Sequence, residues 1–160
     1  MRGAILPDAL LATALGLAIG FVAPAVARVS TAIMIAGAVV VALLPVAGLS
    51  DDIVFAGCWL SVLAAAACVH LPGGLSRWPA FALAANCGVW AGLVSHLSQG
   101  AVALVYAMPA ILVVLPAQMM VARTWGIAVK VAASWLIAIA ALEVALTLVP
   151  TPGYKPDHLE

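Results

Sequence analysis

Two ionisable residues, Lys130 and Glu143, lie inside the last long apolar stretch of the chain, residues 125–150. A charge in hydrocarbon costs several kcal/mol unless it is paired, hydrated or able to reach the interface, so such residues are candidates for function. In a helix, a separation of 13 residues places them about 20 Å apart along the axis and on different faces. Each of the two therefore needs a partner of its own.

Lys130 follows Arg123 by seven residues, or roughly 10 Å of helix. Its long stem can return the ammonium group to the headgroups, so we interpret Lys130 mainly as an interfacial anchor. Glu143 has a shorter reach. We expect it to face the bundle interior, to be hydrated in a cavity, or to carry a proton. Thr147 follows one turn later on the same face, where it can share a hydrogen bond with Glu143.

Asn86 lies near the middle of another apolar stretch, where an amide either bonds a neighbouring helix or lines a pore. The histidines His70 and His96 fall at the ends of helices that run in opposite directions. Two rings near opposite membrane faces cannot share a haem or a metal ion, so we predict no cofactor and no metal. The predicted substrate or ion pathway consists of Glu143, Asn86, His96 and Thr147.

Three further acidic residues, Asp8, Asp51 and Asp52, precede or open apolar stretches on the same predicted side as Glu143. They are either helix caps or an outer acidic mouth that attracts cations. Catalysis is not expected, because the chain has no nucleophile with a suitably spaced base, no HExxH, no phosphate loop and no pair of carboxylates on one helical face. Cys58, Cys68 and Cys87 lie inside apolar stretches, where thiols behave as small hydrophobic groups.

The composition places the whole chain in a bilayer. Hydrophobic residues make up 67% of it, charged residues only 8%, and the mean hydropathy is +1.26. A soluble domain of 160 residues would expose large apolar patches with such a composition. The apolar stretches are continuous rather than alternating, which favours helices over a β-barrel. The formal charge balances at zero without a basic run, so nucleic acid is not an expected partner.

The breaks between apolar stretches predict an all-α polytopic membrane protein with six transmembrane helices arranged as three antiparallel hairpins. Residues 1–150 form the transmembrane domain, and residues 151–160 form a short polar tail. Pro109 and Pro116 are expected to kink the fifth helix. The predicted spans are residues 8–27, 31–49, 53–71, 79–97, 101–122 and 125–150.

Three alternate turns carry Arg28, Arg77 and Arg123, whereas the other two turns contain no Lys or Arg. By the positive-inside rule these arginines, with Lys130, anchor the inner side of a cytoplasmic membrane, and both termini face outward. The arginines are 49 and 46 residues apart. This spacing indicates either a threefold hairpin repeat or only the topology rule, and we favour the rule because the apolar residues around the arginines do not align.

Two GxxxG spacings, Gly16 with Gly20 and Gly88 with Gly92, allow close helix contact. Six short helices leave little room for a central path, so we expect a homo-oligomer formed through these faces. The predicted function is a transporter or channel-like protein for a small solute or cation, with a buried carboxylate on the pathway. The alternative is a non-transporting subunit that docks onto a larger membrane partner. A distant third option, an intramembrane enzyme acting on lipid, requires a second carboxylate or histidine close to Glu143.

Overall fold

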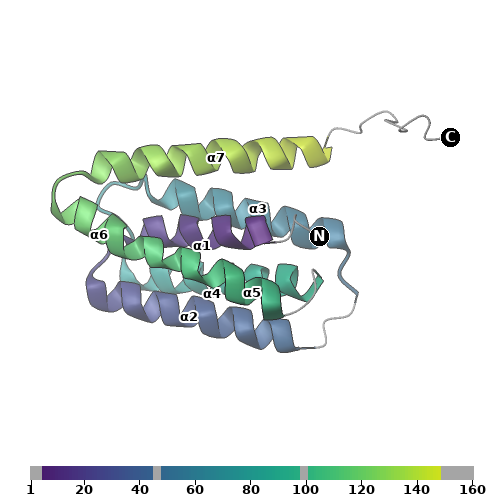
Figure 1. The fold of residues 1–160 in the computed structure, drawn as a ribbon. Helices are drawn as coiled ribbons and strands as arrows, with labels where there is room; N and C mark the ends of the chain where they lie inside the picture. The colour runs from purple at the N-terminus through teal and green to yellow at the C-terminus, as the bar shows by residue number, and fades with distance from the viewer. Residues whose placement is uncertain (1–4, 45–47, 98–100, 149–160) are drawn as a thin grey trace.

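The computed structural model describes residues 5–44, 48–97 and 101–148, which fold as a bundle of helices (Figure 1). No strand occurs in these three ranges. The all-α prediction is therefore confirmed for the described part of the chain. The elements are α1 (Ile5–Ile19), α2 (Pro24–Leu43), α3 (Asp51–Cys68), α4 (Arg77–Leu97), α5 (Ala101–Ala107), the 3-10 helix η1 (Met108–Val113), α6 (Val114–Ala122) and α7 (Gly126–Leu148).

Five helical segments of the described chain are long and apolar enough to cross a membrane, as expected of an integral membrane protein. They correspond to α2, α3, α4, the continuous α5–η1–α6 segment and α7. The first helix is shorter: the 15 residues of α1 extend for only about 22 Å, against roughly 30 Å for a hydrocarbon core. Of the six predicted spans, five thus correspond to helices that are long and apolar enough to cross a membrane.

The first predicted turn, at residues 28–30, is wrong. The chain turns earlier, between Ile19 and Pro24, and Arg28 lies in the second turn of α2. Pro24 explains the difference, because its ring and missing N–H prevent it from continuing α1, while its fixed φ suits the first turn of a new helix. The predicted first span of residues 8–27 therefore contains most of α1, the turn after it and the start of α2.

The fifth predicted span is interrupted, as its prolines indicated. The α-helix α5 gives way at Met108 to six residues of 3-10 helix that include Pro109, and α-helical geometry resumes in α6. Pro116 lies in the first turn of α6, where a missing backbone donor costs little. The 3-10 stretch begins one residue before Pro109 and ends three residues before Pro116.

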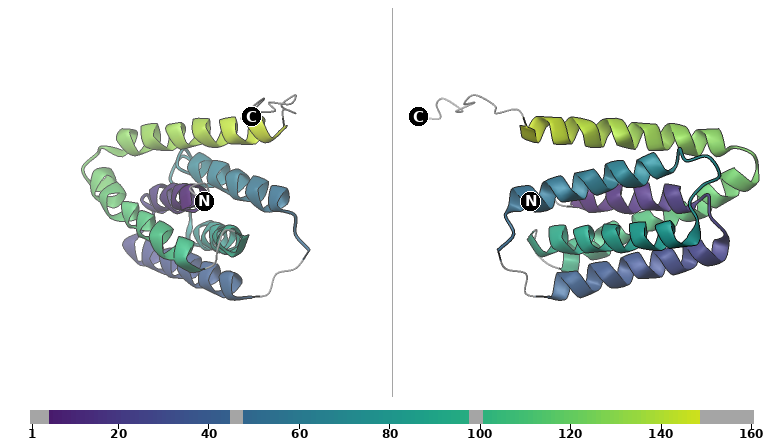
Figure 2. Two further views of the ribbon diagram at one scale, coloured as in Figure 1. Left: turned by 45° about the vertical axis from the view of Figure 1, so that its right-hand side comes forward. Right: turned by 180° about the vertical axis from the view of Figure 1, so that it is seen from behind.

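Helix α1 occupies the centre of the bundle, with the other helices arranged around it (Figure 2). Its side chains are buried on every face between Leu11 and Gly20 except for the half-buried Thr13. A helix that is apolar all round is expected in such a position. α1 packs chiefly against α3, η1 and α4.

The most extensive helix pair is α2 with α4, followed by α3 with α7, whereas α1 and its chain neighbour α2 barely touch. Helices α1, α3 and the α5–η1–α6 segment run in one direction, and α2, α4 and α7 run in the other (Figure 1). The most extensive pair, α2 and α4, is therefore parallel. In the sequence, α3 lies between these two helices and runs in the opposite direction. The predicted arrangement as three hairpins is not confirmed by this packing.

Both GxxxG faces are used inside the chain. Gly88 and Gly92 on α4 lie against Met34 and Ala38 of α2. Gly16 on α1 and Gly20 directly after α1 lie against the η1–α6 segment, where their nearest neighbours are backbone atoms of Ile111 and Val114 and the Cβ of Ala117. The homo-oligomer stays a prediction, and it would need a surface other than these four glycines.

The alternating helix directions bring the three arginines to one end of the bundle, near the start of α2, at the start of α4 and after the end of α6. All three side chains are exposed. We call this the arginine end. The start of α1 and the end of α7 lie together at the opposite end (Figure 1). Which end faces the cytoplasm stays a prediction.

Candidate functional site

Asp8 is fully buried, with an exposed fraction of 0%. It lies in the first turn of α1. The Ser95 hydroxyl donates a hydrogen bond of 2.8 Å to Asp8 Oδ2, whereas Asp8 Oδ1 is buried and has no hydrogen-bond partner. No basic side chain within the described ranges forms an ion pair with this carboxyl group. A buried carboxylate with one unpaired oxygen is a costly group that stability alone does not require.

The fold explains how this pair forms. Helices α1 and α4 are antiparallel neighbours, so the first turn of α1 meets the last turns of α4, and residues 87 apart in sequence become adjacent. The first turn of a helix also suits a carboxylate, because the helix dipole presents its positive end there. Pro7 is buried beside Asp8. Pro7 and Asp8 are therefore enclosed within the bundle, whereas Leu6 in the same turn is exposed.

The predicted acidic mouth is divided by the structure. Asp51 and Asp52 are exposed in the first turn of α3, but Asp8 lies in the interior rather than at an exposed mouth. The three carboxylates thus have different surroundings, although all three open helices at the same end of the bundle. Among the described residues, no cluster of three or more His, Cys, Asp or Glu side chains could hold a metal ion.

Glu143 lies on α7, which stands at the edge of the bundle against α3 (Figure 2). Its side chain is half-buried, and neither a hydrogen bond nor an ion pair connects it to another side chain in the described ranges. Thr147 belongs to the last turn of α7, but its side chain lies outside the described residues. Within the described ranges, neither a basic partner nor a second carboxylate is bonded to Glu143.

A comparison of the chain with protein-family models, with curated proteins and with solved structures finds no match. The functional argument therefore rests on the geometry of the chain itself. Within that geometry, Asp8 is the acidic side chain most completely removed from solvent among the described residues.

Asn86 forms a bridge between α3 and α4. Its Nδ2 donates to Ser61 Oγ at 2.8 Å, and its Oδ1 accepts from Trp90 Nε1 at 3.2 Å. The Trp90 ring lies over Gly57, where a side chain would collide with it. Asn86 is nevertheless exposed on the outer surface of the bundle. Of the two interpretations of this amide, the structure shows the bond to a neighbouring helix.

The remaining predicted residues are spread over the two ends. His96 is exposed near the end of α4, and no hydrogen bond connects it to Asn86 or Glu143. At the arginine end, His70 Nε2 lies 3.4 Å from Ser134 Oγ, which itself donates to the Lys130 carbonyl at 3.0 Å. Lys130 is half-buried. Asn86, His96 and Glu143 are therefore not joined by hydrogen bonds in the described part of the chain, and the side chain of Thr147 lies outside it.

Sequence reasoning did not identify Ser95 as a partner of Asp8. One signal for the burial of Asp8 was present: residues 9–20 contain only apolar or small side chains apart from Thr13. A helix without a polar face is expected at the centre of its bundle. A carboxylate in its first turn is then close to the interior as well.

Proposed function

We propose that this protein is a transporter or channel-like protein of the cytoplasmic membrane for a small cation or a proton, with Asp8 as the interior carboxylate of the pathway. The observation that carries the proposal is the buried Oδ1 atom of Asp8, which lacks a hydrogen-bond partner. A proton or a small cation would neutralise this group. Ionisable residues inside membrane bundles mark ion pathways and proton relays in general.

The distribution of charge supports a cationic substrate. Asp51 and Asp52 are exposed at the end of the bundle where α1 begins, and Glu143 lies in the half of α7 nearest that end. Carboxylates grouped around an entrance raise the local concentration of cations. The arginines lie at the other end, which by the positive-inside rule faces the cytoplasm. Cations would then enter from outside, past the exposed acids, toward Asp8.

The test compares two isosteric neutralisations, Asp8→Asn and Glu143→Gln, in the purified full chain reconstituted into liposomes. A pH-sensitive dye inside the vesicles reports proton flux, and a potassium-sensitive dye reports cation flux. We expect Asp8→Asn to reduce flux at least tenfold, because it removes the negative charge of the carboxylate. The amide oxygen can still accept the hydrogen bond from the Ser95 hydroxyl. Glu143→Gln should retain flux within about twofold.

Two outcomes would contradict the proposal. Wild-type flux in Asp8→Asn liposomes would remove Asp8 from the pathway, and a loss confined to Glu143→Gln would move the pathway to α7. Wild-type protein that conducts no more than empty vesicles, for protons and for cations, would refute transport of these substrates. Thermal unfolding of each variant in the same detergent verifies that a loss of flux is not a loss of fold.

A second candidate function, a subunit of a larger membrane assembly, is favoured by the exposure of Asn86. This amide lies near the middle of α4 and faces outward, where lipid provides no hydrogen-bond partner. A partner chain covering Asn86 would satisfy its second N–H. Native mass spectrometry after mild-detergent extraction tests this role: a stoichiometric foreign chain that is lost in Asn86→Leu would establish it, and a single-chain or homo-oligomeric mass would refute it.

A further inference from the structure

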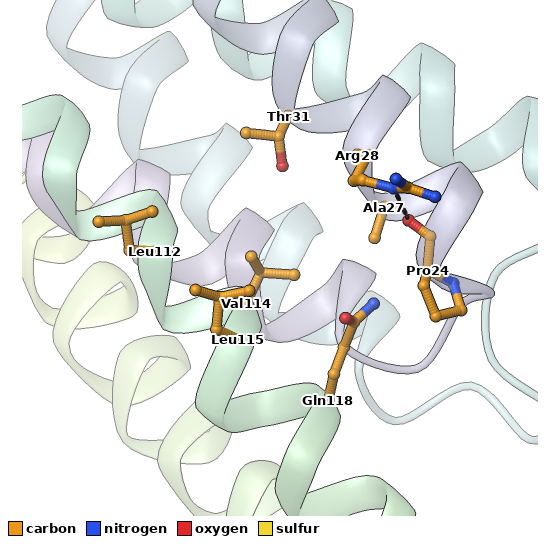
Figure 3. Close-up of a pocket in the computed structure, with 8 residues that line it drawn as sticks. All are labelled: Pro24, Ala27, Arg28, Thr31, Leu112, Val114, Leu115 and Gln118. Carbon is orange, nitrogen blue, oxygen red and sulfur yellow. Dashed lines mark hydrogen bonds between the residues drawn. The ribbon is translucent and has the colours of Figure 1, made fainter.

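A cleft of about 280 Å³ opens on the outer surface of the bundle between α2 and the η1–α6 segment (Figure 3). Arg28 and Thr31 line it from α2, and Leu112, Leu115 and Gln118 line it from the other side. The cleft lies at the arginine end, within the first two turns of α2. Pockets that enclose drug-sized ligands measure roughly 300–1,000 Å³. This cleft is therefore large enough for one small group of a ligand, and the rest of that ligand would lie along the surface of the bundle.

The cleft contains hydrogen-bond donors that are unsatisfied or only weakly satisfied. The Arg28 guanidinium is exposed, and its one hydrogen bond is a long contact of 3.4 Å from Nε to the Pro24 carbonyl. Gln118 Nε2 is buried with no partner. The Thr31 hydroxyl faces the same space (Figure 3). No acidic side chain of the described chain pairs with Arg28. The site is therefore complementary to an anion.

The apolar side chains determine which anion fits. Leu112 and Leu115 are 58% and 57% exposed on the outside of the bundle. Since α6 runs toward the arginine end, Leu115 and Leu112 lie roughly 4.5 and 9 Å deeper than Gln118 along the helix direction. The donors thus stand near the membrane interface, and the leucines extend from them toward its middle. A free phosphate would leave the leucines uncovered.

We propose that this cleft binds an anionic phospholipid of the surrounding membrane, with the phosphate held by Arg28 and Gln118 and an acyl chain lying over Leu115 and Leu112. Basic pockets between transmembrane helices on the cytoplasmic side bind anionic headgroups in general. Arginine suits the role because its planar guanidinium can donate two parallel hydrogen bonds to a phosphate. The bound lipid would cover the junction between α2 and η1–α6.

The test measures lipid retained by the purified full chain in native mass spectrometry, after exchange into mixed micelles with equal phosphatidylglycerol and phosphatidylcholine. Wild-type protein should retain phosphatidylglycerol in preference to phosphatidylcholine. Arg28→Gln should lower that retention about five- to tenfold, the loss expected for one charged phosphate contact. The matched control is Arg77→Gln, because Arg77 is exposed at the same end but stacks on Trp78 at 5.2 Å outside the cleft. It should change retention less than twofold.

Further measurements distinguish a phospholipid site from a site for free phosphate. Leu115→Ser removes apolar cover without changing charge and should also weaken retention, whereas millimolar inorganic phosphate should not displace the lipid. Displacement by phosphate, or an unaffected Leu115→Ser, would replace the lipid site by a simple anion site and overturn the proposal. Equal losses in Arg28→Gln and Arg77→Gln, or no preference for the anionic lipid, would overturn it as well. Arg28→Lys keeps the charge and should retain more phosphatidylglycerol than Arg28→Gln. Thermal unfolding of both variants verifies that the loss of lipid is not a loss of fold.

Discussion

The interface between α2 and α4 contains a matched pair of glycines that tests its geometry directly. A Cβ added at Gly88 would lie 2.6 Å from the Met34 carbonyl oxygen, 3.2 Å from Met34 Cα and 3.3 Å from Ala38 N. A Cβ added at Gly37, on the facing helix, would lie 3.6 Å from Gly88 Cα, which is an ordinary van der Waals contact. Substitution by alanine should therefore affect stability differently at these two glycines, although they face each other across the interface.

The magnitudes follow from two opposing terms. Replacing a helical glycine by alanine gains up to about 1 kcal/mol of helix propensity. Overpacking costs about 1–3 kcal/mol, and at Gly88 the atoms in the way belong to the backbone of α2, so no side-chain rotation relieves it. We therefore expect a cost in the upper part of this range, so that Gly88→Ala lowers the free energy of unfolding by about 1–2 kcal/mol. Gly37→Ala should leave it unchanged or raise it by up to about 1 kcal/mol.

Thermal unfolding in one detergent, monitored by circular dichroism, measures the stability of both variants, and native mass spectrometry measures their oligomeric state. A Gly88→Ala protein as stable as wild type, or a Gly37→Ala protein less stable than Gly88→Ala, would refute the packing argument. A third result is also informative. If Gly88 faced another copy of the chain, Gly88→Ala would dissociate an oligomer at an unchanged unfolding temperature.

The same unfolding assay checks three further substitutions. Thr124 has a left-handed φ of 66° in the turn after α6, which is strained for a β-branched residue, so Thr124→Gly should stabilise the protein by about 0.5–1 kcal/mol; a loss of stability would contradict this. Ser61→Ala removes the acceptor of Asn86 and should cost about 0.6 kcal/mol, at most roughly 1.7. Ser30 Oγ is buried without a partner, so Ser30→Ala should be neutral or stabilising by up to about 1 kcal/mol. A larger loss of unfolding free energy for Ser30→Ala than for Ser61→Ala would contradict both expectations.

Helix boundaries were predictable where the breaking residues were strong. The predicted break between residues 71 and 79 contains the Pro72-Gly73-Gly74 run, and this run separates α3 from α4. Asp51 and Asp52 open α3, as predicted. The first turn lies earlier than predicted, because Arg28 marks the side of the membrane but not the end of a helix. Arginine does not break helices, whereas Pro24 does. Pro24 is therefore a better indicator of the helix boundary than Arg28.

The candidate site was less predictable, because it depends on tertiary order. The sequence shows a carboxylate at residue 8 and a serine at residue 95, but only the central position of α1 and its antiparallel contact with α4 bring them together. Glu143 is a candidate from the sequence because it lies in a long apolar stretch. Its half-buried position follows from the place of α7 at the edge of the bundle, which the amino-acid pattern of α7 does not reveal.

The parallel pairing of α2 with α4 has a consequence for the assembly of the protein during synthesis. Two helices that run the same way cannot meet as a hairpin when they leave the insertion machinery, because α3 must first cross in the opposite direction. Until α4 is made, the face of α2 at Met34 and Ala38 has only lipid or the translocon to cover it. Chains truncated after Cys68 would therefore expose this face, and quality-control proteases should degrade them faster than chains that reach Leu97.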